Sequence, residues 1–160
     1  MKYLNSFNES NRFLMMKNIV EDIKDISIDL QDDGFTINMM PDDDIKLKML
    51  TIRGEIGSSN GKSPFYIEVS KFKGYYNLVS NYLDKGHPFN IEEVKPTLER
   101  IIDYAKSLGM SCELEASIPN HATRSRKFEI KDEFPDIGNP KNVMWVRINF
   151  RGSQMIPLTN

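Results

Sequence analysis

Residues 90–117 read NIEEVKPTLERIIDYAKSLGMSCELEAS, and their pattern predicts a helix, a glycine stop and a strand. The apolar residues of the first part recur at three- and four-residue steps, as on one face of a helix: Val94, Leu98, Ile101, Ile102, Ala105 and Leu108. Asn90 is a favourable N-cap, with Glu93 three residues later as in a capping box. Because proline fits a helix best in its first turn, a helix that begins near Pro96, with residues 90–95 as a turn, is the alternative.

The end of this helix is predicted at Gly109, a residue type that readily adopts the left-handed conformation found after many helices. From Met110 to Ser117 apolar and polar residues alternate, which predicts a half-buried strand. One strong segment therefore specifies both a helix and the strand that follows it.

The same order occurs once more, around Gly34. Residues 10–32 have mainly helical apolar spacing, and residues 35–39 then alternate up to Pro41. Since residues 21–41 and 96–116 align without a gap on their glycines, we favour helix–glycine–strand in both places. A hairpin that turns at residues 32–34 is the alternative.

Alternation predicts three further strands, at residues 45–52, 65–69 and 143–150. The last has one apolar face, with Trp145 on the other. Residues 72–84 are predicted as a short helix, although a strand also fits. The sequence therefore predicts an α+β two-layer sandwich, a mainly antiparallel sheet of about five strands with two principal helices on one face.

The length of 160 residues suits one domain, which we place at residues 10–151, between an N-terminal arm (1–9) and a C-terminal tail (152–160).

The composition limits the partners that we expect. The net charge of −2 gives no general basic footprint for nucleic acid. No apolar run approaches the roughly 20 residues of a membrane span, so no membrane partner is expected. The single cysteine, Cys112, is expected to be a small buried residue of a protein in a reducing compartment.

The chemical motifs of common enzyme classes do not match this sequence. Gly54–Ser63 resembles a phosphate loop, but the required first glycine falls on Ile56, so a hairpin loop is expected instead. The two histidines, His87 and His121, form no metal-ligand spacing, and no nucleophile elbow is present. We therefore expect no catalytic residues, no metal, no cofactor and no enzymatic activity.

Two segments are candidate binding surfaces. Residues 119–141 form a predicted loop between two hairpin partners, longer than the roughly 12–15 residues at which loops become uncommon. Its basic residues are His121, Arg124, Arg126 and Lys127. Residues 71–76 mix basic and aromatic side chains, including Lys71, Lys73 and Tyr75, a combination that suits single-stranded nucleic acid. We favour the simpler interpretation, in which these aromatic rings pack against the protein while the lysines extend to solvent.

The opening of the chain carries a resemblance. Met1, Lys2, Leu4, Phe7 and Glu9 match a Met-Lys-x-Ile/Leu-x-x-Phe-x-Glu pattern, and residues 23–35 match a second pattern, Ile-Lys-Asp-Ile-x-x-x-Leu-x-Asp-x-Gly-Phe. In both the chain resembles small uncharacterised proteins of tailed bacteriophages. The resemblance implies no activity and no site residues.

From this resemblance and the missing catalytic motifs we expect a non-enzymatic protein-binding protein. It would be a virion accessory component or a binder of a host factor, found in the host cytoplasm or the virion. Its partner would be another protein or a second copy of itself. The alternative is a nucleic-acid-binding module that uses the basic residues 121–127.

Overall fold

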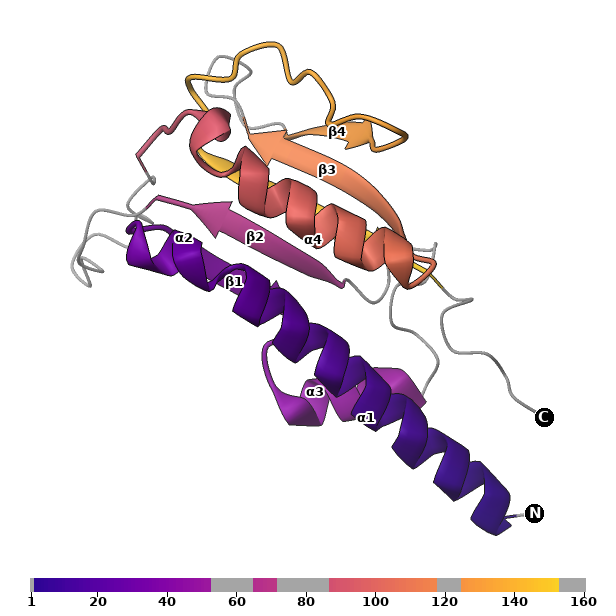
Figure 1. The fold of residues 1–160 in the computed structure, drawn as a ribbon. Helices are drawn as coiled ribbons and strands as arrows, with labels where there is room; N and C mark the ends of the chain where they lie inside the picture. The colour runs from indigo at the N-terminus through magenta and orange to yellow at the C-terminus, as the bar shows by residue number, and fades with distance from the viewer. Residues whose placement is uncertain (1, 53–64, 72–86, 118–124, 153–160) are drawn as a thin grey trace.

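The computed structural model describes residues 2–52, 65–71, 87–117 and 125–152, and only the backbone of residues 2–9 and 49–52. These residues form a five-stranded antiparallel sheet with helices on one face (Figure 1). The helices are α1 (Lys2–Ile26), α2 (Ile28–Asp32), α3 (Asp44–Ile52) and α4 (Lys95–Ser107), with a 3₁₀ turn η1 (Ile91–Glu93) before α4. The strands are β1 (Thr36–Met40), β2 (Tyr66–Ser70), β3 (Ser111–Ser117), β4 (Ser125–Glu129) and β5 (Trp145–Arg151). The expected α+β two-layer architecture is confirmed.

The strands lie in the order β1-β2-β5-β3-β4, and every neighbouring pair is antiparallel. β5 is central, because it pairs with β2 on one side and with β3 on the other. Ile148 of β5 faces Ile67 and Leu114 in register, and all three side chains are fully buried. This row lies at the centre of the core.

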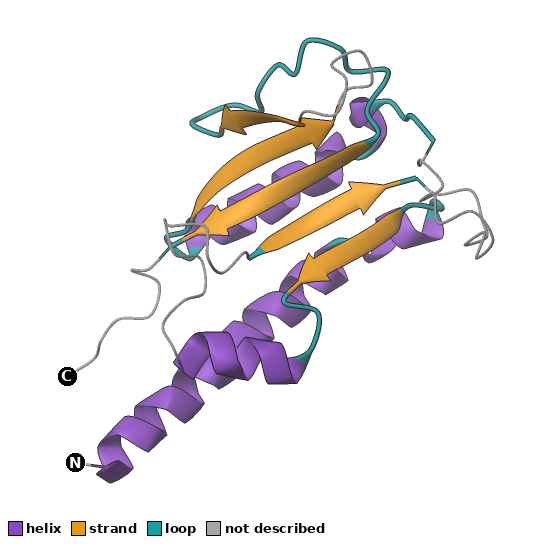
Figure 2. Ribbon diagram, turned by 180° about the vertical axis from the view of Figure 1, so that it is seen from behind, coloured by secondary structure: helices purple, strands orange, loops and turns teal. Residues whose placement is uncertain are grey.

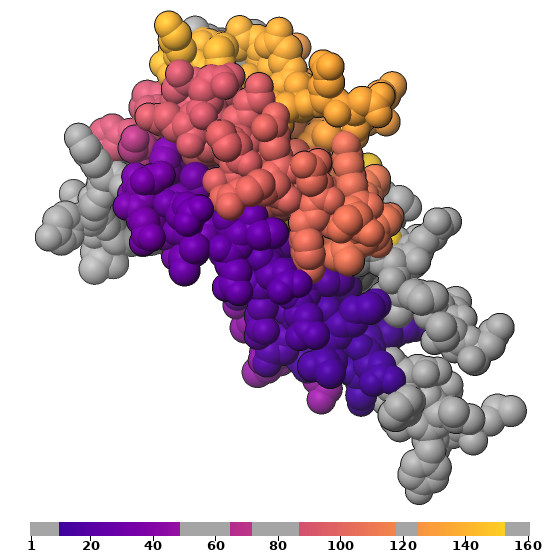
Figure 3. All heavy atoms as spheres, viewed as in Figure 1, coloured from indigo at the N-terminus to yellow at the C-terminus, as the bar shows by residue number. Residues whose placement is uncertain are grey.

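The helix layer covers one side of the sheet, as the view from behind in Figure 2 makes clear. α4 packs over β3 and β5, α2 contacts β1, and α1 contacts both α3 and α4. The N-terminal half of α1 extends past the sheet, and in Figure 3 the surfaces of α1 and α4 adjoin. Polar contacts join α4 to α1 and α2: Tyr104 donates a hydrogen bond to Asp22, and Arg100 donates one to Asp29 at 3.1 Å.

Both predicted glycine stops are present and have the same geometry. Gly34 and Gly109 have φ angles of 84° and 81°. Gly34 N donates to the carbonyl three residues back and Phe35 N to that of Leu30, and Gly109 N and Met110 N repeat this arrangement. These paired bonds satisfy the last helical carbonyl groups. Helix–glycine–strand is therefore confirmed at both places, and the alternative hairpin at residues 32–34 is wrong.

The start of α4 follows the alternative prediction. α4 begins at Lys95, with Pro96 in its first turn, and a helix that runs unbroken from Asn90 is wrong. The Asn90 side chain accepts a hydrogen bond from Glu92 N at 3.1 Å, so it caps η1 instead. Pro96 explains the break, because its ring would clash with the preceding turn of a continuous helix.

The strand predicted at residues 45–52 is wrong, because these residues form α3. The Asp43 carboxylate accepts a hydrogen bond from Lys46 N at 2.7 Å, and its carbonyl accepts one from Leu47 N at 3.0 Å, which starts the helix. Ile45 is 74 % exposed and Leu47 only 3 %, so the part of α3 whose side chains are described, residues 44–48, buries one side, against α1.

The long loop predicted at residues 119–141 is also corrected, since it contains β4. β4 pairs with β3 on the side away from β5, with Phe128 opposite Leu114. The strands predicted around residues 65–69, 110–117 and 143–150 are confirmed as β2, β3 and β5, and Trp145 lies opposite the buried face of β5 as expected. The predicted loop at 54–63 and helix at 72–84 lie outside the described residues.

Candidate functional site

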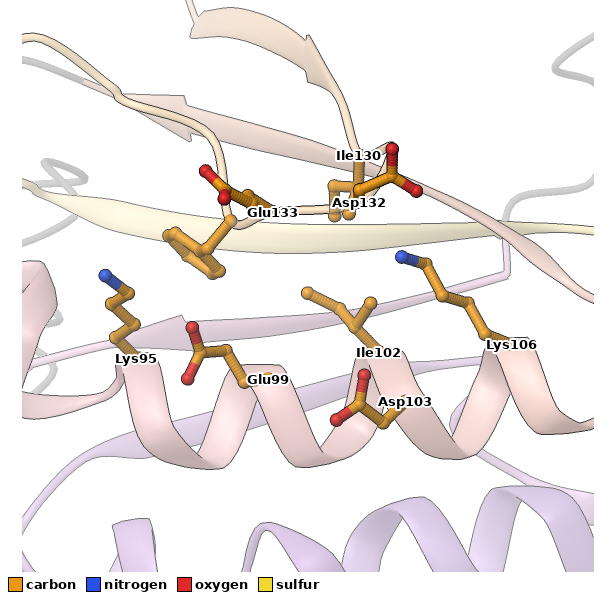
Figure 4. A pocket seen from close by; sticks show the side chains of 9 residues that line it. Lys95, Glu99, Ile102, Asp103, Lys106, Ile130, Asp132 and Glu133 are labelled. Atoms are coloured by element: carbon orange, nitrogen blue, oxygen red, sulfur yellow. The ribbon is translucent and has the colours of Figure 1, made fainter.

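A hollow of about 430 Å³ lies between α4 and the segment that follows β4 (Figure 4). Its floor is apolar and consists of Ile102, Ile130 and Phe134. Its rim is charged and consists of Lys95, Glu99, Asp103, Lys106, Asp132 and Glu133. We call this feature the α4 hollow. Ile102 and Ile130 are nearly buried, at 4 % and 8 % exposure, and belong to the hydrophobic core. The floor of the hollow is therefore the outer edge of that core.

Two lysines hold residues 130–134 against α4. Lys106 donates a hydrogen bond from its ammonium group to the carbonyl oxygen of Lys131. At the other end of the segment, the Lys95 ammonium lies 5.5 Å from the centroid of the Phe134 ring. Since α4 separates these two lysines by three turns, they fix the two ends of the hollow and leave its middle open (Figure 4).

The carboxylates of the rim lack partners among the described residues. Glu99, Asp103, Asp132 and Glu133 make no hydrogen bond or ion pair through their side chains with any other residue of the described ranges. The lysines, in contrast, are engaged: Lys95 also lies 3.9 Å from Glu92. Four carboxylates and two ammonium groups give the rim a net charge of −2. The α4 hollow therefore combines an apolar floor with exposed carboxylates that have no partner among the described residues.

The sheet face opposite the helices carries a polar network centred on Arg147 of β5. The Arg147 guanidinium donates to the same Glu68 oxygen at 2.6 and 3.1 Å. It lies 3.9 Å from the ring centroid of Tyr66 and 5.1 Å from that of Trp145. A cation between two aromatic faces is stabilised by both rings. Arg147 therefore ties β5 to β2 through charge and packing together.

Glu115 continues this network on β3. Its carboxylate accepts hydrogen bonds from Ser125 and from Asn149, the latter at 3.2 Å, and lies 3.9 Å from Arg147. Burial alone would raise its pKa, but these two hydrogen bonds and the charges of Arg147 and Lys127 together lower the pKa of Glu115 below its ordinary value. The charges on this face thus compensate one another, unlike those of the α4 hollow.

The site residues expected from sequence lie at two separate places. Arg126 and Lys127 lie exposed on the edge strand β4, where the Lys127 ammonium is 3.6 Å from Glu113. Lys71 follows β2, with its ammonium 5.0 Å from the centroid of Phe35 and 3.8 Å from Glu93. Because β5 and β3 lie between β2 and β4, the structure does not bring the two groups together. His121, Arg124, Lys73 and Tyr75 lie outside the described residues.

No three His, Cys, Asp or Glu side chains in the described part of the chain are grouped so that they could hold a metal ion. Cys112 is buried, and burial raises the pKa of its thiol to about 11. None of the described helices combines the length and apolar character needed to cross a membrane.

The α4 hollow was not expected from the sequence. The positions 95, 99, 102, 103 and 106 share one face of a helix, which is visible in the spacing, but such a face is normally just solvated. It becomes a hollow because residues 130–134, which follow β4, lie opposite this face of α4.

Comparisons with protein-family models, with curated proteins and with solved structures find no match to this chain.

Proposed function

We propose that this chain is a non-enzymatic protein-binding protein and that the α4 hollow receives part of its partner. The supporting observation is the combination of an apolar floor with four carboxylates that have no partner in the described part of the chain. Together with the bacteriophage-like opening, this favours a virion accessory component or a binder of a host factor, as expected above.

The size of the hollow limits what enters it. About 430 Å³ lies within the range of small-molecule pockets, whereas a stable protein interface buries roughly 1,200–2,000 Å² in total. The hollow would therefore hold one anchoring side chain of the partner, and the surrounding surfaces of α4 and residues 130–134 would supply the rest of the contact. Central buried anchors of this kind dominate many interfaces.

Site-specific photo-crosslinking tests the proposal. p-Benzoylphenylalanine would replace Glu133, which is exposed on the rim, or Ile45, which is exposed on α3 and remote from the hollow. After irradiation in a lysate of the cells of origin, we expect a discrete protein adduct from position 133 and none from position 45. Equal adducts from both positions, or no adduct from position 133, would overturn the proposal.

A second candidate function is nucleic-acid binding, which one observation favours. The exposed Arg126 guanidinium lies 5.8 Å from the ring centroid of Phe128, next to Lys127 on the edge strand β4. Basic side chains beside an aromatic ring can contact the phosphates of a nucleic acid while the ring stacks on a base. Fluorescence anisotropy with a single-stranded oligonucleotide decides the matter: binding that weakens with salt, and with Arg126→Ala/Lys127→Ala, supports it. Absence of binding at low salt excludes it.

A further inference from the structure

We propose that the α4 hollow recognises a basic side chain, an arginine or lysine in an exposed segment of the partner protein. The carbon stem of that side chain would lie on the apolar floor, and its charged end would meet the carboxylates of Glu99 and Asp103. This inference rests on the function proposed above and specifies the chemistry of the partner.

The charges of the rim select a cation. Negative groups outnumber positive ones by four to two, and both lysines already have contacts at the ends of the hollow. An anionic ligand would therefore approach these carboxylates without finding a free ammonium group among the described lining residues. Figure 4 shows the Glu99 carboxylate in the gap between α4 and the facing segment, where a cation that enters the hollow would meet it.

The placement of Glu99 and Asp103 supports the same conclusion. They are four residues apart on α4, so their side chains are neighbours on one face of the helix. Like charges at this spacing destabilise a helix. A bound cation between them would remove this repulsion, so occupation of the hollow by a basic side chain also stabilises α4.

The apolar floor distinguishes a basic side chain from a bare metal ion. Ile102, Ile130 and Phe134 offer no ligand atoms, and a volume of about 430 Å³ is far larger than the roughly 30 Å³ that one water molecule occupies. Arginine and lysine bury their carbon stems on apolar surface while the charge stays at the polar margin. The hollow offers the matching surfaces, an apolar floor for the carbon stem and a charged rim for the end group.

The protein itself provides an example of this recognition. The Lys95 ammonium lies 5.5 Å from the centroid of Phe134 and 3.9 Å from a carboxylate oxygen of Glu92. One end of the hollow is thus already occupied by a cation between an aromatic ring and a carboxylate. The partner's basic group would repeat this arrangement in the middle, where the carboxylates have no counterpart in the described part of the chain.

An NMR titration of the full chain tests the chemistry directly. The probes are n-propylguanidinium, which mimics the end of an arginine side chain, and n-propylurea, its neutral isostere, at constant ionic strength. We expect n-propylguanidinium to shift the amide signals of residues 99–106 and 130–134 in a saturable manner, and n-propylurea to bind at least about fivefold more weakly. Equal binding of both probes would overturn the proposal.

Matched variants distinguish an effect of the charges at the hollow from an effect of the protein's net charge. Glu99→Gln/Asp103→Asn removes two charges at the hollow, and Asp25→Asn/Asp33→Asn removes two exposed charges elsewhere in the first 33 residues. We expect the first variant to weaken n-propylguanidinium binding at least about fivefold and the second to leave it within twofold. Equal losses in both variants would overturn the proposal. Well-dispersed spectra of both variants show that each is folded.

The crosslinking assay then distinguishes the two proposals. With p-benzoylphenylalanine at position 133, the variant Glu99→Gln/Asp103→Asn should lose most of the partner adduct. An undiminished adduct would overturn the basic partner but leave protein binding at the hollow intact. Saturable n-propylguanidinium binding without any adduct in the unaltered hollow would support the cationic site and overturn the proposed function.

Discussion

Arg147 is the residue on which the face opposite the helices most depends. Its guanidinium contacts Glu68, Glu115, Tyr66 and Trp145, which come from all three central strands. The Arg147 and Glu68 side chains are only partly exposed, at 26 % and 18 %, so water screens this pair less than an ion pair at the surface. Removal of the guanidinium would therefore remove the ion pair of Glu68 and one of the two positive charges that offset Glu115.

We expect Arg147→Ala to lower the free energy of unfolding by about 2 kcal/mol, between the values typical of exposed and buried pairs. Arg100→Ala is the matched control, because Arg100 also pairs with a carboxylate, that of Asp29, but with a side chain 54 % exposed. Its loss should be below about 1 kcal/mol. Urea unfolding followed by circular dichroism measures the free energy of unfolding of both variants. Equal losses would contradict a larger contribution of Arg147 than of Arg100.

Glu115 should make stability depend on pH in the acid range. Its pKa is lower in the folded chain than the ordinary value of 4.5, so the ionised carboxylate stabilises the fold at neutral pH. This contribution is fully present above pH 4.5 and is lost as the pH falls through the lowered pKa. We expect Glu115→Gln to be less stable than the unaltered protein at pH 7, with a smaller difference at about pH 3. Urea unfolding at both pH values measures this, and a difference that stays constant would refute it.

At the scale of elements, Gly34 and Gly109 end the two helices in the same way. A Cβ atom at either position would meet nothing within 4 Å, so the cost of a substitution lies in the backbone alone. We expect Gly34→Ala and Gly109→Ala each to lower the free energy of unfolding by about 1–2 kcal/mol, because left-handed backbone disfavours a side chain. Asparagine tolerates this conformation better, so Gly→Asn should cost less than Gly→Ala at both sites. Thermal unfolding compares the four variants, and a neutral Gly109→Ala would contradict the explanation.

These two glycines also explain which elements could be predicted from the sequence. Around each of them, local signals agree: helical spacing, a residue suited to positive φ, then alternation. β2 and β5 were likewise predictable because each alternates between a buried and a polar face. The favoured helical structure through Asp32 was confirmed too, with a break at Ser27 between α1 and α2.

α3 and β4 were not predictable because contacts distant in sequence decide them. Ile45 and Leu47 alternate as in a strand, yet Leu47 packs against α1 and Asp43 caps a helix. β4 has a weak pattern of its own and becomes a strand by pairing with β3. The α4 hollow depends on the same event, since β4 delivers Ile130 and Phe134 to α4. The polar rim was therefore visible in the sequence, but not the surface that faces it.

For the whole molecule, β5 decides whether there is one sheet or two. Without it, β1–β2 and β3–β4 would be separate two-stranded ribbons, which are marginally stable in water. We expect a chain that ends at Asn142 to show no cooperative unfolding transition, and a peptide of residues 143–152 to restore one. Trp145 is the single tryptophan and lies on β5, so its fluorescence reports whether the peptide is bound. A cooperative transition in the shortened chain alone would contradict the central role of β5.

The position of β5 also has a consequence during synthesis. β5 follows the other four strands in the chain, although it lies between β2 and β3 in the sheet. At roughly 5–20 residues per second, a ribosome needs on the order of ten seconds to make the segment from β1 to β5. From the moment each is made until β5 appears, the inner edges of β2 and β3 have no strand to pair with, and unpaired edges can join the edges of neighbouring nascent chains. The speed of translation up to Trp145, more than the stability of the finished fold, therefore sets how long each new copy is exposed to aggregation.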